Sequence, residues 1–373
     1  MTPSSNRGFN HRQALSEDWF RARVLPRVAA ARFLPHQIRQ IRHEHLPVLL
    51  RAQNRKSVAR MAEELLTTSV RWRCLPFHYV RYGVYRHGIS AEEVGSYLPE
   101  TVLFHRLLPR VNRDLVSLDD KVIGKRILAG AGIPQPALLA CGNRRGGVTS
   151  DGRTVDIDRV IRLFSSRGRV VVKPARYSSG GAGIVIVRSG EEHFSLAAYA
   201  RRWGSWLVEE HVRQHPDLDV LNPYALNTFR VITLLKGTSA EVLFTLLKLG
   251  GAGRATDNSA DGGLQIRVWP DGRLDRRGYD RRLAAHSHHP VTSVPFAGRR
   301  IAYVDAVREL AARCAALFPQ TPFIGWDIAV TPGGPVVIEG NSSPSLAHIQ
   351  RTHGGVARRL LPELRSVMDR PLT

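Results

Sequence analysis

Cysteine and long apolar runs are scarce in this chain. Its 373 residues include 3 cysteines, Cys74, Cys141 and Cys314, which are odd in number and far apart. That pattern excludes a disulfide framework and a Cys-x-x-Cys zinc site, so we expect reduced, mostly structural thiols. Apolar runs such as residues 170–172 and 336–338 are far shorter than the roughly 18 to 20 residues that span a bilayer. Residues 1–10 are polar and lack the apolar core of a secretory signal, which predicts a cytoplasmic protein.

Acidic residues are outnumbered, and the formal net charge is +22. Among the 54 basic residues lysine is rare, occurring only as Lys56, Lys121, Lys125, Lys173, Lys236 and Lys248. Such a charge indicates either a diffuse basic surface or an anionic partner, for which an acidic substrate and an anionic membrane surface are the candidates. We expect no specific nucleic-acid partner, because the aromatic residues are not interleaved with the basic ones as base stacking requires.

The apolar spacing divides the chain into a helical start and a mixed remainder. Up to about residue 113 the spacing is helical, as at Val58, Met61, Leu65 and Val70. The Ser-x-x-Asp pattern at residues 117–120 resembles a capping box that opens a further helix, which glycines end at 130 and 132. Beyond it we expect strands at residues 169–173, 184–187, 206–209, 229–235 and 242–247, and a helix at 303–317.

Residues 323–330 and 335–339 predict an antiparallel hairpin with a Pro-Gly-Gly turn. Pairing Val330 with Val336 would place Asp327 opposite Glu339, with β-carbons about 4.5 to 5.5 Å apart. Asn341 follows on the same face, two residues further. Two opposed carboxylates repel unless a cation lies between them, and an all-oxygen set suits a hard ion such as magnesium. The alternative is a solvated acidic strand face.

A glycine-rich loop follows the strand that ends at Lys173. Its glycines allow backbone amides to approach phosphate oxygens, and its serines add donors. The loop is neither a Walker A loop nor a dinucleotide fingerprint, because no Gly-Lys-Ser/Thr follows and it opens onto a strand. Lys121 would lie in the first turn of its helix, where helix amides also favour anions. Ordinary surface lysines and an ordinary glycine-rich hairpin are the alternatives.

Two other features allow more than one interpretation. Arg230 falls in an apolar strand, where a buried guanidinium needs an anion, supplied either by a phosphate or by a structural ion pair. His286, His288 and His289 cluster before a proline, and they fit a plain surface, the lining of a substrate loop or a transition-metal site.

The order of these parts resembles the ATP-grasp superfamily over roughly residues 115 to 350. Residues 339–344, Glu-Gly-Asn-Ser-Ser-Pro, look like the Glu-x-Asn-x-x-Pro metal motif of its carboxylate-amine ligases. The Asp120-Lys121 pair is similar to the family's pair at a helix start. Within the superfamily, the sugar-transfer-associated branch related to α-L-glutamate ligases is indicated by residues 222–223, 227–233, 257–258, 262–263, 289–290 and 325–328.

The resemblance implies an α+β ATP-grasp fold, in which two α/β lobes with antiparallel sheets clasp ATP. A helical, arginine-rich region at 1–114 would precede an N-terminal lobe at 115–210 and a C-terminal lobe at 211–373. The implied cofactors are ATP and Mg²⁺, or Mn²⁺, with the metal on Asp327, Glu339 and Asn341. The implied catalytic residues are Arg230, Lys248 and Asn258. The nucleotide would contact Lys121, Lys173, Ser178, Ser179, Gly180, Gly181, Glu209, Glu210 and Val212.

Three positions depart from the family pattern. Trp326 stands where peptide-type ligases usually carry arginine, which argues against a D-alanine-ligase-like substrate, and Lys248 stands where arginine is commoner. Either Asp217 or Asp219 would be the acid that binds ribose.

The implied activity is an ATP-dependent carboxylate-amine ligase that works through an acyl phosphate, in the modification of a surface polysaccharide or peptide-glycan. Its substrates would be a small or glycan-linked carboxylate and an amine such as an amino acid. The alternatives are an ATP-grasp kinase that phosphorylates a hydroxyl of an acidic small molecule or sugar, and a non-catalytic protein that binds nucleic acid or a membrane surface.

Overall fold

The computed structural model describes residues 39, 42–43, 46–176, 178, 181–189, 194–251, 263–280 and 282–368. The chain forms two compact units, divided between Val94 and Gly95. Among the described residues, no helix is long and apolar enough to cross a membrane.

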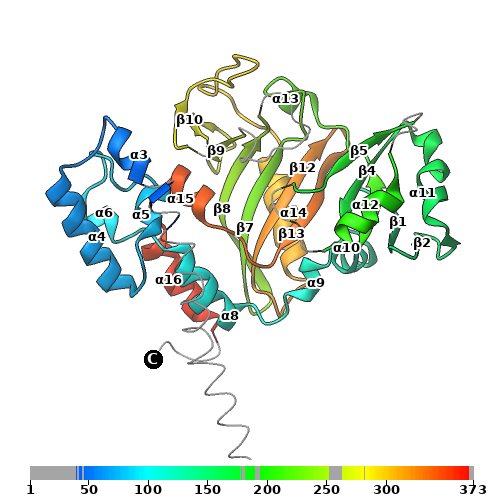
Figure 1. Cartoon of the computed structure of the whole chain (residues 1–373), viewed down its shortest axis with the longest axis horizontal. Coiled ribbons are helices and arrows are strands. Elements are labelled where there is room, and N and C mark those ends of the chain that lie inside the picture. The colour runs from blue at the N-terminus through cyan, green and yellow to red at the C-terminus, as the bar shows by residue number, and fades with distance from the viewer. Residues whose placement is uncertain are drawn as a thin grey trace, which may run out of the picture. The chain divides into compact units, whose positions relative to one another are not determined.

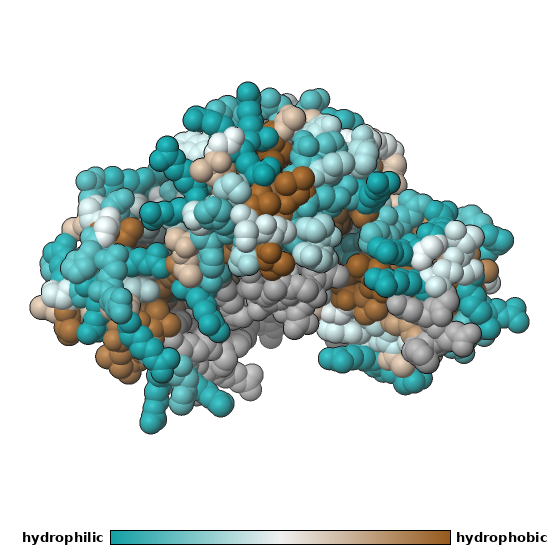
Figure 2. All heavy atoms as spheres, turned by 90° about the horizontal axis from the view of Figure 1, so that it is seen from above, coloured by the Kyte–Doolittle hydropathy of each residue, from teal (hydrophilic) through white to brown (hydrophobic). Residues whose placement is uncertain are grey.

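The first unit is helical (Figure 1). Its helices are α3 (Leu46–Arg51), α4 (Val58–Trp72), α5 (Phe77–Arg81) and α6 (Ala91–Val94). The Ser57 hydroxyl caps α4 by accepting from the Arg60 amide, and a buried ion pair between Lys56 and Glu64 holds the helix to the segment before it. Large apolar side chains such as Leu66 and Val70 on α4 are exposed. Figure 2 shows hydrophobic atoms among hydrophilic ones on the left, where this unit lies.

The second unit begins with short helices and contains two antiparallel sheets (Figure 1). The leading helices are α7 (Glu100–Val102), the π-helix η2 (Leu103–Leu107), α8 (Leu108–Val111), α9 (Val116–Asp119) and α10 (Lys121–Gly130). Asp120 caps α10, because its Oδ1 accepts from the Val122 and Ile123 amides. The predicted capping box at Ser117 is therefore wrong, since Ser117 lies inside α9. The helix ends as expected, with Gly132 at positive φ just beyond it.

The smaller sheet has the strand order β3-β2-β1-β6-β4-β5. Its strands are β1 (Leu138–Asn143), β2 (Gly146–Thr149), β3 (Thr154–Val155), β4 (Arg169–Pro174), β5 (Val185–Arg188) and β6 (Trp206–Glu210). Helices α11 (Ile157–Leu163) and α12 (Leu196–Trp203) supply Val160, Leu196 and Ala200 to a core shared with β1, β4 and β6. A short 3₁₀ turn, η3 (Ser165–Arg167), leads into β4.

The larger sheet has the order β11-β10-β9-β8-β7-β12-β13. Its strands are β7 (Thr228–Lys236), β8 (Ser239–Leu249), β9 (Leu264–Val268), β10 (Leu274–Tyr279), β11 (Ala285–His286), β12 (Phe323–Thr331) and β13 (Gly334–Asn341). The associated helices are α13 (Pro216–Asp219), α14 (Val304–Ala315), α15 (Ala347–His353) and α16 (Ala357–Ser366). The apolar stripe of α14, including Val307 and Leu310, packs on one face of this sheet. The opposite face carries Arg230 and Asp327 together with buried apolar residues such as Ile232.

Candidate active site

A cavity of about 940 Å³ in the second unit is lined by residues of both sheets. It contains every predicted site residue that the structure describes, namely Lys121, Lys173, Ser178, Gly181, Glu209, Glu210, Val212, Arg230, Lys248, Asp327, Glu339 and Asn341. The predicted residues Ser179, Gly180 and Asn258 lie outside the described residues. Residues spread over 220 positions of sequence are thus brought to one place by the two sheets.

The β12–β13 hairpin places Asp327 directly opposite Glu339, as the sequence predicted. The register that leads there differs from the prediction, because Val330 pairs with Pro335 and not with Val336. A β-bulge restores the expected pair: Ile328 lies opposite Val337 and Asp327 opposite Glu339, so Ile338 is the extra residue. Ile338, Glu339 and Asn341 all line the cavity.

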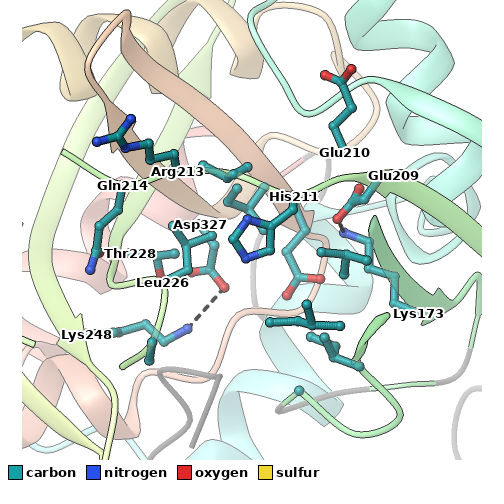
Figure 3. A pocket seen from close by; sticks show the side chains of 18 of the residues that line it. Lys173, Glu209, Glu210, His211, Arg213, Gln214, Leu226, Thr228, Lys248 and Asp327 are labelled. Carbon is teal, nitrogen blue, oxygen red and sulfur yellow. Dashed lines mark hydrogen bonds and ion pairs between the residues drawn. The ribbon is translucent and has the colours of Figure 1, made fainter. Parts of the chain in front are cut away.

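Asp327 is buried and receives hydrogen bonds from two basic side chains of neighbouring strands. On β7, Arg230 lies opposite Asp327 and donates from Nε to Oδ1 at 2.6 Å and from Nη2 to Oδ2 at 2.9 Å. On β8, Lys248 donates from Nζ to Oδ2 at 3.3 Å, an interaction drawn in Figure 3. Burial alone would raise the pKa of Asp327, but the two cations hold that pKa well below its usual range. The carboxylate is therefore ionised.

Glu339 is only partly buried and, within the described part of the chain, makes no hydrogen bond or ion pair with another side chain. The Asn341 amide nitrogen donates to the Gly325 carbonyl at 3.1 Å, which leaves Oδ1 as the atom that can bind a cation. No group of three or more His, Cys, Asp and Glu side chains suited to a metal occurs among the described residues. A metal here would need the Asn341 amide beside the two carboxylates, and these oxygen donors fit magnesium.

The smaller sheet contributes Lys173 to the cavity, beside Glu209 (Figure 3). Lys173 at the end of β4 pairs with Glu209 on β6, with Nζ 2.7 Å from Oε1. A second lysine, Lys125 on α10, lies 2.8 Å from Glu209 Oε2. Lys121, one helical turn earlier, donates to Ser178 Oγ at 3.1 Å, and burial lowers its pKa. Glu209 therefore contacts two lysines with its side chain.

The start of α10 is tied to the loop that follows β4. The Lys121 backbone N–H donates to the Ala175 carbonyl at 2.9 Å, and Arg176 Nε donates to Asp120 Oδ2 at 2.5 Å. The residue that caps the helix thus also fixes the base of the glycine-rich loop. This arrangement holds Lys121 and Ser178 at the same edge of the cavity.

Residues 211–227, which include α13, connect the two sheets and contribute to the lining of the cavity. A buried polar network holds this segment in place. Asn227 is fully buried, and its side chain bonds to Gln214 Oε1, to the Asn222 carbonyl and to the Gly250 amide. Gln214 also donates to Asp219 at 2.6 Å. Asp219 lines the cavity, whereas Asp217 lies outside the lining and beside His215. Glu210 pairs with Arg167 and, in the view of Figure 3, points away from Glu209.

The histidine cluster is divided among separate interactions. His289 is fully buried; its Nε2 donates to the Gly250 carbonyl at 3.0 Å, and burial lowers its pKa. His286 lies 3.4 Å from Asp280, and His288 contacts Ser287. His289 is thus held by backbone groups next to the strand end from which Lys248 projects.

Trp326 does not face the cavity. Its side chain is fully buried, donates to Thr233 Oγ1 at 3.0 Å and packs on Phe318 below α14. Neighbouring residues of a strand face opposite sides, so Asp327 points to the cavity and Trp326 to the core. Trp326 therefore does not line the cavity, and the expectation that the missing arginine argues against a D-alanine-ligase-like substrate stays a prediction.

Sequence reasoning missed Lys125, which contacts the cavity residue Glu209 from outside the lining. Its signal was present, because lysine is rare in this chain and Lys125 follows Lys121 by four residues, on the same face of a helix. It also missed Arg169 and Arg188, which are paired across β4 and β5 and line the cavity.

The second unit has the ATP-grasp fold. Its two antiparallel sheets enclose one cavity, which is lined by lysines and by carboxylates. The chain belongs to the sugar-transfer associated ATP-grasp family, whose model matches residues 103–366. The superfamily, the branch and the fold class expected from the sequence are confirmed.

Solved structures with similarity to the chain include two ligases and a carboxylase. The D-alanine-D-alanine ligase from Coxiella burnetii has 14% identity and a TM-score of 0.38, covering 64% of this chain and 50% of that one. The D-alanine–D-alanine ligase from Bacillus anthracis in complex with ATP has 15% identity and a TM-score of 0.38, covering 68% of each chain. Biotin carboxylase from Campylobacter jejuni has 13% identity and a TM-score of 0.43, covering 69% of this chain and 47% of that one. The chain thus spans about half to two thirds of their lengths, and no curated protein matches it.

Proposed function

We propose that this protein is an ATP-dependent ligase that joins a carboxylate to an amine through an acyl phosphate. The observation that supports this proposal best is the meeting of Asp327 and Glu339 with Arg230, Lys121 and Lys173 around one cavity. Family membership supports the use of ATP. We further propose the lobe boundaries 115–210 and 211–373, since one sheet falls in each range.

The nucleotide base would bind at the β6 end of the cavity. Val171, Ile184 and Ile186 supply apolar surface there, next to the backbone of residues 210–212. Asp219 is the acid placed to accept from the ribose, because it lines the cavity and Asp217 does not. Gln214 holds that carboxylate in place through its 2.6 Å hydrogen bond.

The phosphates would lie between the lysine wall and the carboxylate wall. Here Lys121, Lys173, Arg230 and Lys248 line the cavity together with Glu209, Asp327 and Glu339, so basic side chains lie on both walls. Basic side chains around a cavity attract an anionic ligand. A polyphosphate that arrives with its divalent cation fits this lining of basic and acidic side chains.

Asp327, Glu339 and Asn341 would hold that cation, Mg²⁺ or Mn²⁺. When bound, it supplies neutralisation of charge on the phosphate oxygens. The bidentate Arg230–Asp327 contact fixes the guanidinium beside this position, where it can stabilise the phosphoryl group in transfer. Lys248 would complete the set of residues around the phosphates, together with Asn258, which lies outside the described residues.

In the proposed reaction a substrate carboxylate oxygen attacks the γ-phosphorus, and the bond to ADP breaks. The amine nitrogen then attacks the acyl carbon, phosphate leaves with the carboxylate oxygen, and the amine loses a proton. The protein contributes mainly position and electrostatic stabilisation. The family description supports a glycan-linked acid or acceptor in the modification of a surface polysaccharide or peptide-glycan.

The test is release of ADP from Mg·ATP across a panel of carboxylates, each with and without amino acids and amino sugars. The proposal predicts that ADP release requires a carboxylate and that an amide accumulates only with an amine. A stable phosphorylated product that forms without any amine would instead establish a kinase. Failure to bind Mg·ATP, together with salt-sensitive binding to polyanions, would establish a non-catalytic binding protein.

A further inference from the structure

Lys125 lies behind the cavity and is buried with only 5% of its side chain exposed. Its Nζ donates to the Pro136 carbonyl at 3.0 Å and lies 2.8 Å from Glu209 Oε2. On the other side of the same carboxylate, Oε1 is 2.7 Å from Lys173 Nζ. One buried carboxylate is therefore shared by two buried ammonium groups.

The two lysines differ in what else they contact. Lys173 lines the cavity, whereas Lys125 lies outside its lining and turns to a backbone carbonyl. A neutral pair of Lys173 and Glu209 would present no net charge to the cavity. With Lys125 bound to the same carboxylate, one positive charge is in excess, and Lys173 is the member that can direct it at a ligand.

Resting on the nucleotide site proposed above, we propose that Lys125 is a positioning residue: it neutralises Glu209 so that the charge of Lys173 stays available to the polyphosphate. Helix α10 serves the site twice, because Lys121 reaches Ser178 at the cavity edge and Lys125, one turn later, reaches the buried carboxylate. Glu209 in turn sets the position of Lys173 by its short ion pair.

The decisive variants are Lys125→Met and the double variant Lys125→Met with Glu209→Gln. In the single variant Glu209 would be left to Lys173 alone, and the affinity for Mg·ATP should fall about tenfold to a hundredfold. In the double variant the acid is gone, Lys173 is released, and much of that affinity should return. A role confined to folding would not produce such a recovery.

The chain offers a matched control in Lys56→Met. Lys56 and Glu64 form another buried ion pair, with 2.8 Å between Nζ and Oε2 and side chains 7% and 5% exposed, in the other unit. Loss of Lys56 should lower thermal stability, as loss of Lys125 should, and leave the affinity for Mg·ATP unchanged.

Calorimetric titration with Mg·ATP and thermal unfolding of full-length variants decide the matter. Unchanged affinity in Lys125→Met, or a folded double variant as weak as the single one, overturns the inference while the proposed function stands. If the wild type does not bind Mg·ATP, the inference and the proposed function both fail. If Lys125→Met does not fold, the double variant alone decides: near-wild-type affinity supports the inference, and weak binding overturns it.

Discussion

Arg230 and Asp327 meet across adjacent strands in a two-point ion pair, with distances of 2.6 Å from Nε to Oδ1 and 2.9 Å from Nη2 to Oδ2. The pair is the structural ion pair that one interpretation of Arg230 expected, and the contact with a phosphate stays a prediction. Removing either partner would leave the other charge buried, so a variant here should lose stability as well as any part in the proposed reaction. Glu339 lies directly opposite Asp327 and makes no such ion pair within the described part of the chain.

Glu339→Gln should therefore separate function from stability. The side chain makes no hydrogen bond or ion pair with another described side chain, so the free energy of unfolding should change by no more than about 0.5 kcal/mol. Turnover should fall about a hundredfold or more, because a metal-binding carboxylate is lost. Steady-state ADP release over a magnesium titration measures this, with Glu309→Gln on α14 as the control; unchanged turnover would remove Glu339 from the metal site.

Gly340→Ala should destabilise the hairpin. An added Cβ would lie 2.7 Å from the Trp326 ring and 2.9 Å from Leu118 Cδ2, and the buried indole has no room to move. We expect a loss of about 1–3 kcal/mol together with displacement of Glu339 and Asn341. Gly333→Ala in the turn of the same hairpin is the control, since its Cβ would meet only Thr331 Oγ1 at 3.6 Å. Urea unfolding of both variants would contradict this account if they were equally stable.

Asn227→Ala should weaken the loop that forms the wall of the cavity. The fully buried amide joins Gln214, Asn222 and Gly250, and truncation leaves several of their polar groups without a partner. The cost should be about 1–3 kcal/mol for each group left unsatisfied. The Michaelis constant for ATP should rise, because Gln214 also holds Asp219. A normal Michaelis constant in a destabilised variant would show that the network serves folding alone.

Stability should fall as the pH drops from about 6.5 towards 4. Burial lowers the pKa of His78 to about 4, from about 6.5 in the unfolded chain. The native state therefore binds fewer protons than the unfolded state in this window, so stability is full above it and is lost as the pH falls. His78→Phe should flatten this slope in urea unfolding measured between pH 7 and pH 4.5. An unchanged slope would mean that His78 is protonated without cost.

The hairpin and its acids were predictable because strand alternation and a Pro-Gly-Gly turn are local features of sequence. The register near the turn was not, because a β-bulge adds one residue to β13 and no local sequence pattern marks Ile338 as that residue. The cap of α10 was misplaced by three residues, because Ser117 and Asp120 are both capable caps and only the path of α9 decides between them. The shared carboxylate of Glu209 depends on contacts over 84 positions of sequence, which no local pattern reports.

The most direct test of the central claim is the fate of the carboxylate oxygen. With an active acid and amine, a carboxylate labelled with heavy oxygen should transfer one labelled atom to inorganic phosphate at each turnover, as detected by mass spectrometry. Unlabelled phosphate formed alongside amide, or a phosphorylated hydroxyl formed without release of phosphate, would contradict the acyl-phosphate ligase proposed here.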